Sequence, residues 1–235
     1  VAYVDGMRGW GRGLRSAIAR WYTSQTADEV AYQATKYQSR DKWSQRDLLR
    51  LSHPVPPTDD HKIIFGWITQ GWDAIGRDAP GNPSARIIWA MESAKRTADP
   101  KTWVNLIREH NLPRECVPTE ALQHAQVWDA LLDKMPLTAL IRNLGNLSKH
   151  GLAAMKSGGR TAEVVARLVD EQAIRRSRVH PVAVLSALMT YQQGKGVRGG
   201  NTWPVSAPVV DALDTAFYNS FGNVVPTGKR IMLAL

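Results

Sequence analysis

Apolar residues recur at helical spacing along nearly all of this 235-residue chain, and proline or glycine interrupts them at short intervals. One such stripe consists of Trp10, Leu14, Ile18 and Trp21. Repeated stripes of this length predict about ten helices in succession. The expected fold is therefore all-α, with stacked antiparallel helix pairs as in an α-solenoid. A compact helical bundle is the alternative architecture.

Local start signals support this prediction. Thr26 with Glu29, and Ser44 with Asp47, have the spacing of capping boxes, in which two residues at a helix start bond each other's backbone. Pro54 is expected to end the second of these helices. Asn82-Pro83 and Asp99-Pro100 have the sequence of an N-cap followed by a first-turn proline.

Positive side chains are frequent in the stretch from Lys36 to His53. Lys36 and Arg40 are four residues apart. Arg46 and Arg50 are also four apart, and His53 follows three residues later. Such intervals place side chains on one helical face, so we expect two helical pieces that separate around Asp41–Trp43. Leucines at 48, 49 and 51 would anchor the opposite face of the second piece. The candidate residues for an anionic partner are Lys36, Arg40, Lys42, Arg46, Arg50 and His53.

The net charge of the whole chain is also positive. The net charge is +9, with twenty arginines and ten lysines. Such an excess favours an acidic partner, most often nucleic acid, although a merely solvated basic surface is the alternative. Tyr37 and Trp43 lie among the cations, where aromatic rings can stack on unpaired bases or belong to the core.

Other features exclude several classes of protein. The single cysteine, Cys116, excludes an internal disulfide and a cysteine-based zinc site, and it fits a reducing compartment, so we expect the cytoplasm. No apolar run approaches the roughly 18 residues that a membrane span needs. His53 and His61 flank a proline loop, and structural or capping roles are favoured over metal binding.

The chain shows no arrangement of residues for catalysis. The segment Gly194–Gly199 matches G-x-G-x-x-G, but a predicted helix precedes it where a dinucleotide site needs a strand, so we interpret it as a basic loop. No nucleophile elbow, phosphate-binding loop or paired carboxylates appear. We therefore expect a binding protein without a cofactor rather than an enzyme.

Longer motifs carry a family resemblance. In order along the chain they are GWGRGLRSAIARWY, TKYQSRDKWSQRDLLRLSHP, MPLTALIRNLGNL, VHPVAVLSALMTYQQGKGVRG and AFYNSFGNVVPTGKRIMLAL. Together they resemble the TROVE domain of the Ro autoantigen family. The resemblance implies HEAT-like helical repeats that form part of a ring and bind Y-type small non-coding RNA on the outer surface. In the family's pattern the RNA-binding residues correspond to Lys36, Arg40 and His53.

The resemblance also implies a role in RNA quality control, in which single-stranded 3′ ends of defective RNAs enter the ring and an exoribonuclease is a possible partner. A helical-repeat scaffold whose basic face docks an acidic protein is the alternative function. We expect residues 1–228 to form a partial TROVE-like domain that lacks the family's first helices. Residues 229–235 would be the first strand of a von Willebrand factor A-like domain, whose metal-binding motif would follow.

Overall fold

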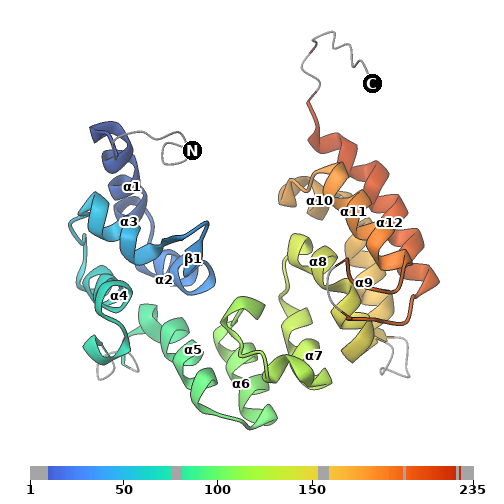
Figure 1. Ribbon diagram of the computed structural model, residues 1–235, viewed down its shortest axis with the longest axis horizontal. Helices are drawn as coiled ribbons and strands as arrows, with labels where there is room; N and C mark the ends of the chain where they lie inside the picture. The colour runs from blue at the N-terminus through green and yellow to red at the C-terminus, as the bar shows by residue number, and fades with distance from the viewer. Residues whose placement is uncertain (1–9, 76–80, 153–158, 198–199, 226–227, 229–235) are drawn as a thin grey trace. The chain divides into compact units, whose positions relative to one another are not determined.

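The computed structural model describes residues 10–75, 81–152, 159–197, 200–225 and 228. These residues form twelve α-helices, and they contain one two-stranded hairpin (Figure 1). The expected all-α fold is confirmed, and the helix Glu171–Ser177 is an addition to the predicted set. The strand expected at 229–235 lies outside the described residues. The chain divides into two compact units, residues 1–122 and 123–235.

The first unit is built from consecutive helices that pack on near neighbours in the sequence. Tyr22, Val30, Ile64 and Ile88 are completely buried in its core. Contacts run from α1 to α3, from α2 to α4 and α5, and from α5 to α6, as expected for stacked helical pairs. Its elements are α1 (Arg12–Ser24), α2 (Ala27–Lys36), β1 (Ser39–Arg40), β2 (Trp43–Ser44), α3 (Gln45–Ser52), α4 (Asp59–Gln70), α5 (Arg86–Arg96) and α6 (Pro100–His110).

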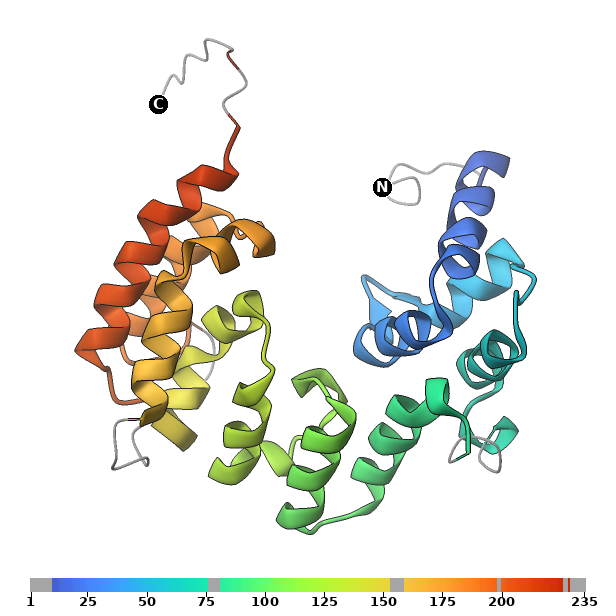
Figure 2. The same cartoon turned by 180° about the vertical axis from the view of Figure 1, so that it is seen from behind.

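The second unit is also helical. Leu140, Leu144, Val164, Leu168 and Leu213 are buried in its core. Helix α12 packs along both α9 and α11, and α8 packs against α11 (Figure 2). Its elements are α7 (Ala125–Asp133), α8 (Leu137–Leu147), a π-helical turn (Ser148–Leu152), α9 (Gly159–Val169), α10 (Glu171–Ser177), α11 (Pro181–Gln192) and α12 (Ala207–Ser220).

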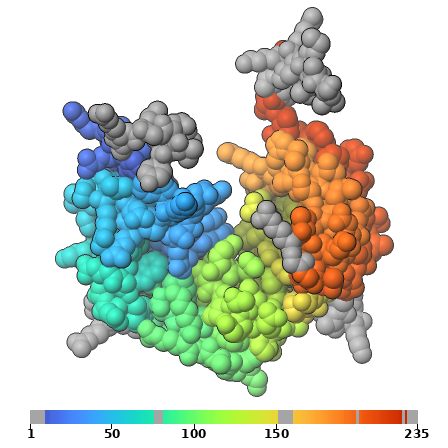
Figure 3. Space-filling view, in the orientation of Figure 1, coloured from blue at the N-terminus to red at the C-terminus, as the bar shows by residue number. Residues whose placement is uncertain are grey.

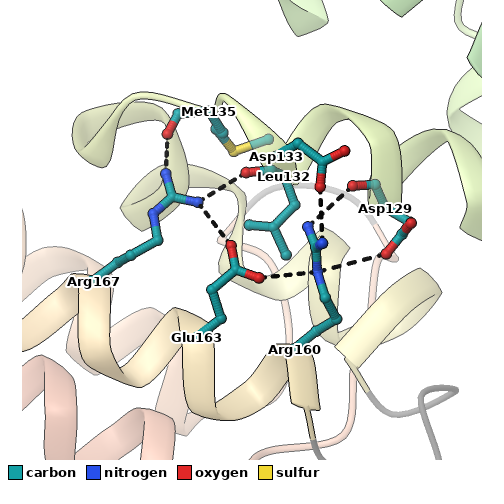
Figure 4. Close-up of polar contacts among 7 residues, drawn as sticks. All are labelled: Asp129, Leu132, Asp133, Met135, Arg160, Glu163 and Arg167. Atoms are coloured by element: carbon teal, nitrogen blue, oxygen red, sulfur yellow. Dashed lines mark hydrogen bonds and ion pairs between the residues drawn. The ribbon is translucent and has the colours of Figure 1, made fainter. Parts of the chain in front are cut away.

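Two arginines of α9 hold the carboxyl end of α7 (Figure 4). Arg167 donates from Nη1 to the carbonyl of Leu132 at 2.8 Å, and from Nη2 to the carbonyl of Met135. Arg160 donates from Nη1 to Asp133 at 2.8 Å. Carbonyls at the end of a helix lack intrahelical donors, so these guanidinium groups satisfy them and join two helices.

Candidate nucleic-acid interface

The helix that carries Lys36 ends at that residue, so Arg40 does not share its face. The expectation of one helical row through Lys36 and Arg40 is wrong. Arg40 lies instead in a β-hairpin, where it pairs with Trp43 across a two-residue turn. The turn residues Asp41 and Lys42 have φ angles of 51° and 68°. Two central residues with positive φ are typical of a hairpin turn that matches strand twist, and helical spacing does not register this signal.

The hairpin presents two of the candidate cations to solvent. Arg40 and Lys42 are both exposed. The Nε of Arg40 lies 3.6 Å from Asp41 Oδ2, and both side chains are more than four-fifths exposed. An ion pair this exposed contributes little and leaves the guanidinium open to an external anion.

Lys36 is held more firmly than the hairpin cations. Its Nζ donates to the hydroxyl of Tyr32 at 3.3 Å and lies 5.4 Å from the ring centroids of both Tyr32 and Tyr37. Partial burial opposes its charge, but Tyr32, Tyr37 and Glu115 outweigh burial and raise the pKa of Lys36. The ammonium group is therefore charged and positioned before any ligand arrives.

Helix α3 begins as predicted from its capping box. Ser44 Oγ accepts from the Asp47 backbone N–H at 3.2 Å, and the Ser44 backbone N–H donates to Asp47 Oδ2 at 2.9 Å. The hydrogen bond from the Ser44 hydroxyl is the main reason that the pKa of Asp47 is lowered. Arg46 and Arg50 then follow one turn apart on this helix, both exposed, as the spacing predicted. The space-filling view shows this part of the chain, in lighter blue, at the surface (Figure 3).

The end of α3 differs from the prediction. The expectation that His53 continues the row of Arg46 and Arg50 is wrong, because α3 stops at Ser52 and His53 is its left-handed cap with φ 48°. Its backbone N–H donates to Leu49 O at 2.9 Å, and its side chain is exposed. The cap is therefore made by the backbone of His53, which leaves the imidazole free of a capping role.

The expected leucine face is only partly correct. Leu49 is buried and Leu48 is half-buried, but Leu51 is 41% exposed. The carbonyl of Leu51 accepts from Arg15 Nε at 3.0 Å, which joins α1 to the end of α3. Arg15 thereby becomes a further exposed cation beside the carboxyl end of α3.

Side-chain amides tie the hairpin to its neighbours. Gln45 Nε2 donates to Tyr37 O at 3.0 Å, and Gln45 Oε1 accepts from the hydroxyl of buried Tyr22. The ring of Trp43 packs on Trp10 with centroids 5.3 Å apart, so it is a packing residue, whereas Tyr37 is 46% exposed. Of the two aromatics among the cations, Tyr37 is thus the one available for stacking.

We call Lys36, Arg40, Lys42, Arg46, Arg50 and His53 the basic segment. Among the residues that the structure describes, Asp41 is the one carboxylate within ion-pair distance of these six side chains. Cations that lack internal partners remain available to an external anion.

The other histidine considered for metal binding has a structural role. His61 is buried, with Nδ1 2.8 Å from Thr58 Oγ1 and Nε2 3.1 Å from Gln25 O. Over the described ranges, no group of three His, Cys, Asp or Glu side chains could hold a metal ion. Within the same ranges, no helix is both long and apolar enough to span a membrane.

Comparison with known proteins identifies relatives of this chain. The chain is 34% identical to the RNA-binding protein RO60 of Caenorhabditis elegans over 97% of its length, and 37% identical to that of Deinococcus radiodurans over 100%. These alignments cover 41% and 43% of the relatives, so the chain spans less than half of their length.

A solved structure shows the same fold. The crystal structure of the Deinococcus radiodurans RO (RSR) protein superposes with a TM-score of 0.76 at 36% identity, covering 97% of this chain and 45% of that one. The sequence model of the TROVE domain matches residues 5–110 and 109–190, which together make up most of the chain. The chain therefore belongs to the TROVE domain family.

Proposed function

We propose that this chain binds RNA through the basic segment. The observation that carries the proposal is the set of six cationic or titratable side chains from Lys36 to His53, which have one carboxylate, the exposed Asp41, within ion-pair distance among the described residues. The names of the two relatives as RNA-binding proteins support the same ligand class.

The local geometry suits phosphate recognition. Arginine forks can bond phosphate oxygens at two points, and Arg46 and Arg50 lie one helical turn apart. Lys36 is a positioned point charge beside Tyr37, whose exposed ring can stack on an unpaired base. The exposed cations of the hairpin, Arg40 and Lys42, complete a surface that would bind phosphate by charge and an unpaired base by aromatic stacking.

The proposed ligand is a structured small non-coding RNA of the Y type. We include the single-stranded 3′ ends of defective RNAs as a second ligand, in a cytoplasmic RNA quality-control role with an exoribonuclease as partner. The proposed action is binding and presentation of RNA, with no chemical step by this chain.

A filter-binding titration with a Y-type RNA tests the proposal. The double variant Lys36→Gln/Arg40→Gln should bind about tenfold more weakly or worse, because two phosphate contacts are lost. The matched control Lys62→Gln/Lys101→Gln removes the same charge from exposed positions elsewhere in the first unit and should bind as the parent does. Equal affinity of both double variants would exclude the basic segment as the site.

His53 requires a variant that keeps the left-handed cap. Asn tolerates this conformation, so His53→Asn removes the imidazole without disturbing the end of α3. We expect a loss of about 1–3 kcal/mol of binding with an unchanged helical circular-dichroism signal. If a pull-down retains the same acidic protein partner after ribonuclease treatment while RNA does not bind, the scaffold function replaces this proposal.

A further inference from the structure

A cavity of about 390 Å³ opens in the second unit between α8, α11 and the loop that follows α11. Its size falls within the range of small-ligand sites, roughly 300–1,000 Å³. It is lined by aromatic, amide and hydroxyl side chains, and an exposed arginine contributes to its wall. Its polar and aromatic lining includes Arg142, Asn146, Ser186, Thr190, Asn201 and Trp203.

The loop fixes an indole ring in the wall of this cavity. Trp203 Nε1 donates to Tyr191 O at 3.2 Å, and its ring lies nearly parallel to that of Tyr191, with centroids 6.3 Å apart. The Trp203 backbone N–H donates to Gly194 O at 2.9 Å, which closes the loop onto the end of α11. Trp203 remains partly exposed and lines the cavity, so part of a fixed indole ring is accessible from it.

Polar groups surround this ring. Asn201 Nδ2 donates to Asn146 Oδ1 at 3.0 Å, and Lys149 Nζ donates to Asn201 Oδ1 at 3.0 Å. The hydroxyls of Ser186 and Thr190 donate to carbonyls of their own helix, which leaves their oxygens as acceptors. The cavity therefore offers a stacking surface together with positioned donors and acceptors, the combination that a nucleobase requires.

The lining of the cavity contains one charged residue, Arg142, and no carboxylate. Residues 137–152 and 181–206, which supply all of its lining, contain no Asp or Glu. Among the described residues of these two segments, three are basic: Arg142, Lys149 and Lys195. In the whole second unit thirteen Lys and Arg residues face seven Asp and Glu residues. An anionic ligand is therefore favoured, and a cationic one finds no partner within the lining.

We propose that this cavity binds one unpaired nucleotide of an RNA strand, with the base against Trp203 and the phosphate near Arg142. The amides of Asn146 and Asn201 and the hydroxyls of Ser186 and Thr190 would face the edge of the base. The ligand class rests on the proposed RNA-binding function, but the site is separate from the basic segment. This cavity would hold a single base with its phosphate, whereas the basic segment would contact several phosphates and stack one base on the exposed ring of Tyr37.

Fluorescence anisotropy with labelled hexauridylate tests this site. Ser186 is an exposed position of α11 that lines the cavity, and Met189 is 52% exposed on the same helix but does not line it. We expect Ser186→Tyr, which fills the cavity, to weaken binding about tenfold, the typical worth of one base–aromatic stack. Met189→Tyr, the matched control, should bind as the parent does.

A charge variant provides a second readout that does not depend on the size of the new side chain. Ser186→Glu places a carboxylate in an acid-free lining and should weaken binding, whereas Met189→Glu should have a much smaller effect. Arg142→Gln should weaken binding more than Arg176→Gln, which removes an exposed arginine of α10. Equal effects within each pair would overturn the assignment.

Competitors distinguish the ligand. Unlabelled hexauridylate should displace the probe, whereas polyphosphate of the same charge should displace it poorly if the base is recognised. Equal competition by polyphosphate, or equal competition by uridine monophosphate, would overturn the proposal that a nucleotide within a strand is bound. Failure here is distinct from failure of the proposed function, because the Ser186 variants should leave binding of a folded Y-type RNA to the basic segment intact.

Discussion

The indole of Trp203 lies directly on the backbone of Gly145. A Cβ atom at residue 145 would approach ring atom Cε3 to 2.7 Å, closer than real side-chain contacts allow. Gly145 is inside α8, where glycine lowers helix stability, so this close approach explains its presence. The contact attaches the loop after α11 to α8 and thereby shapes the cavity between them.

Gly145→Ala should therefore destabilise the protein even though alanine is the better helix former. The gain in helix propensity is about 1 kcal/mol, and displacement of a packed ring costs about 1–3 kcal/mol. We expect the midpoint of urea unfolding, measured by circular dichroism, to fall. Gly66→Ala in α4 is the control, because its Cβ would lie at an ordinary 3.5 Å from Ile75 and should be neutral or stabilising. Equal midpoints for both variants would contradict this account.

Removal of the arginine that bonds the end of α7 should also lower stability. Arg167→Ala loses two hydrogen bonds to the carbonyls of Leu132 and Met135, and we expect a cost of about 1–3 kcal/mol in the free energy of unfolding. Arg176→Ala removes an exposed arginine from the neighbouring helix α10 and should change stability little. Thermal unfolding of the two variants side by side measures the difference, and similar shifts would refute the assigned role.

The capping carboxylate of α3 should make stability sensitive to acid. Hydrogen bonds from Ser44 lower the pKa of Asp47 below its ordinary value of 3.8. Its contribution is therefore complete above that value and is lost as the pH falls through the lowered pKa of the folded state. Asp47→Asn should cost about 0.3–1 kcal/mol near neutral pH, and the difference from the parent should vanish in strong acid.

Urea unfolding at several pH values measures this difference. For the control Glu120→Gln, at an exposed position, the difference in unfolding free energy from the parent should not depend on pH. If Asp47→Asn remains less stable than the parent by the same amount in strong acid, the charge of the Asp47 carboxylate is not what stabilises the helix.

The single cysteine should be unreactive in the folded protein. Burial raises the pKa of the Cys116 thiol to about 11, and a hydrogen bond with Thr35 offsets only part of this effect. Because the thiolate is the reactive form, little of it exists at pH 8. Ellman's reagent should titrate one thiol in urea and almost none without it, and rapid native labelling would show that the site opens.

The salt dependence of RNA affinity should show how many phosphates the basic segment contacts. Neutralisation of about five phosphates on duplex-like RNA gives a log–log slope near −4.5. Arg46→Gln and Arg50→Gln should each reduce the size of the slope by about 1, while Lys101→Gln should leave it unchanged. A slope near zero for the parent protein would show that binding, if observed, does not depend on phosphate.

Helix positions followed from the sequence where the signal was local. The capping boxes at Thr26 and Ser44 lie where predicted, and both helices start directly after them. Apolar spacing also placed core residues such as Leu140 and Leu144 of α8, but Leu14 and Trp21 of the first stripe are 40% and 39% exposed. Such signals act within one or two helical turns, so no tertiary information is needed to recognise them.

The geometry of the basic segment was predicted less well from the sequence. The end of α2 at Lys36 removed Arg40 from the first predicted helical row, and a left-handed cap at His53 removed that residue from the second. Single residues with positive φ interrupt a helix without changing its apolar spacing, so periodicity extends the row past its true end.

The sequence by itself determined an all-α chain with a cation-rich segment from Lys36 to His53, because periodicity, capping and charge are properties of neighbouring residues. The tertiary structure alone decided that Arg15 reaches the end of α3 and that Trp203 covers Gly145. Both contacts join residues far apart in the chain. Local patterns cannot specify such contacts, because they depend on how the helices pack.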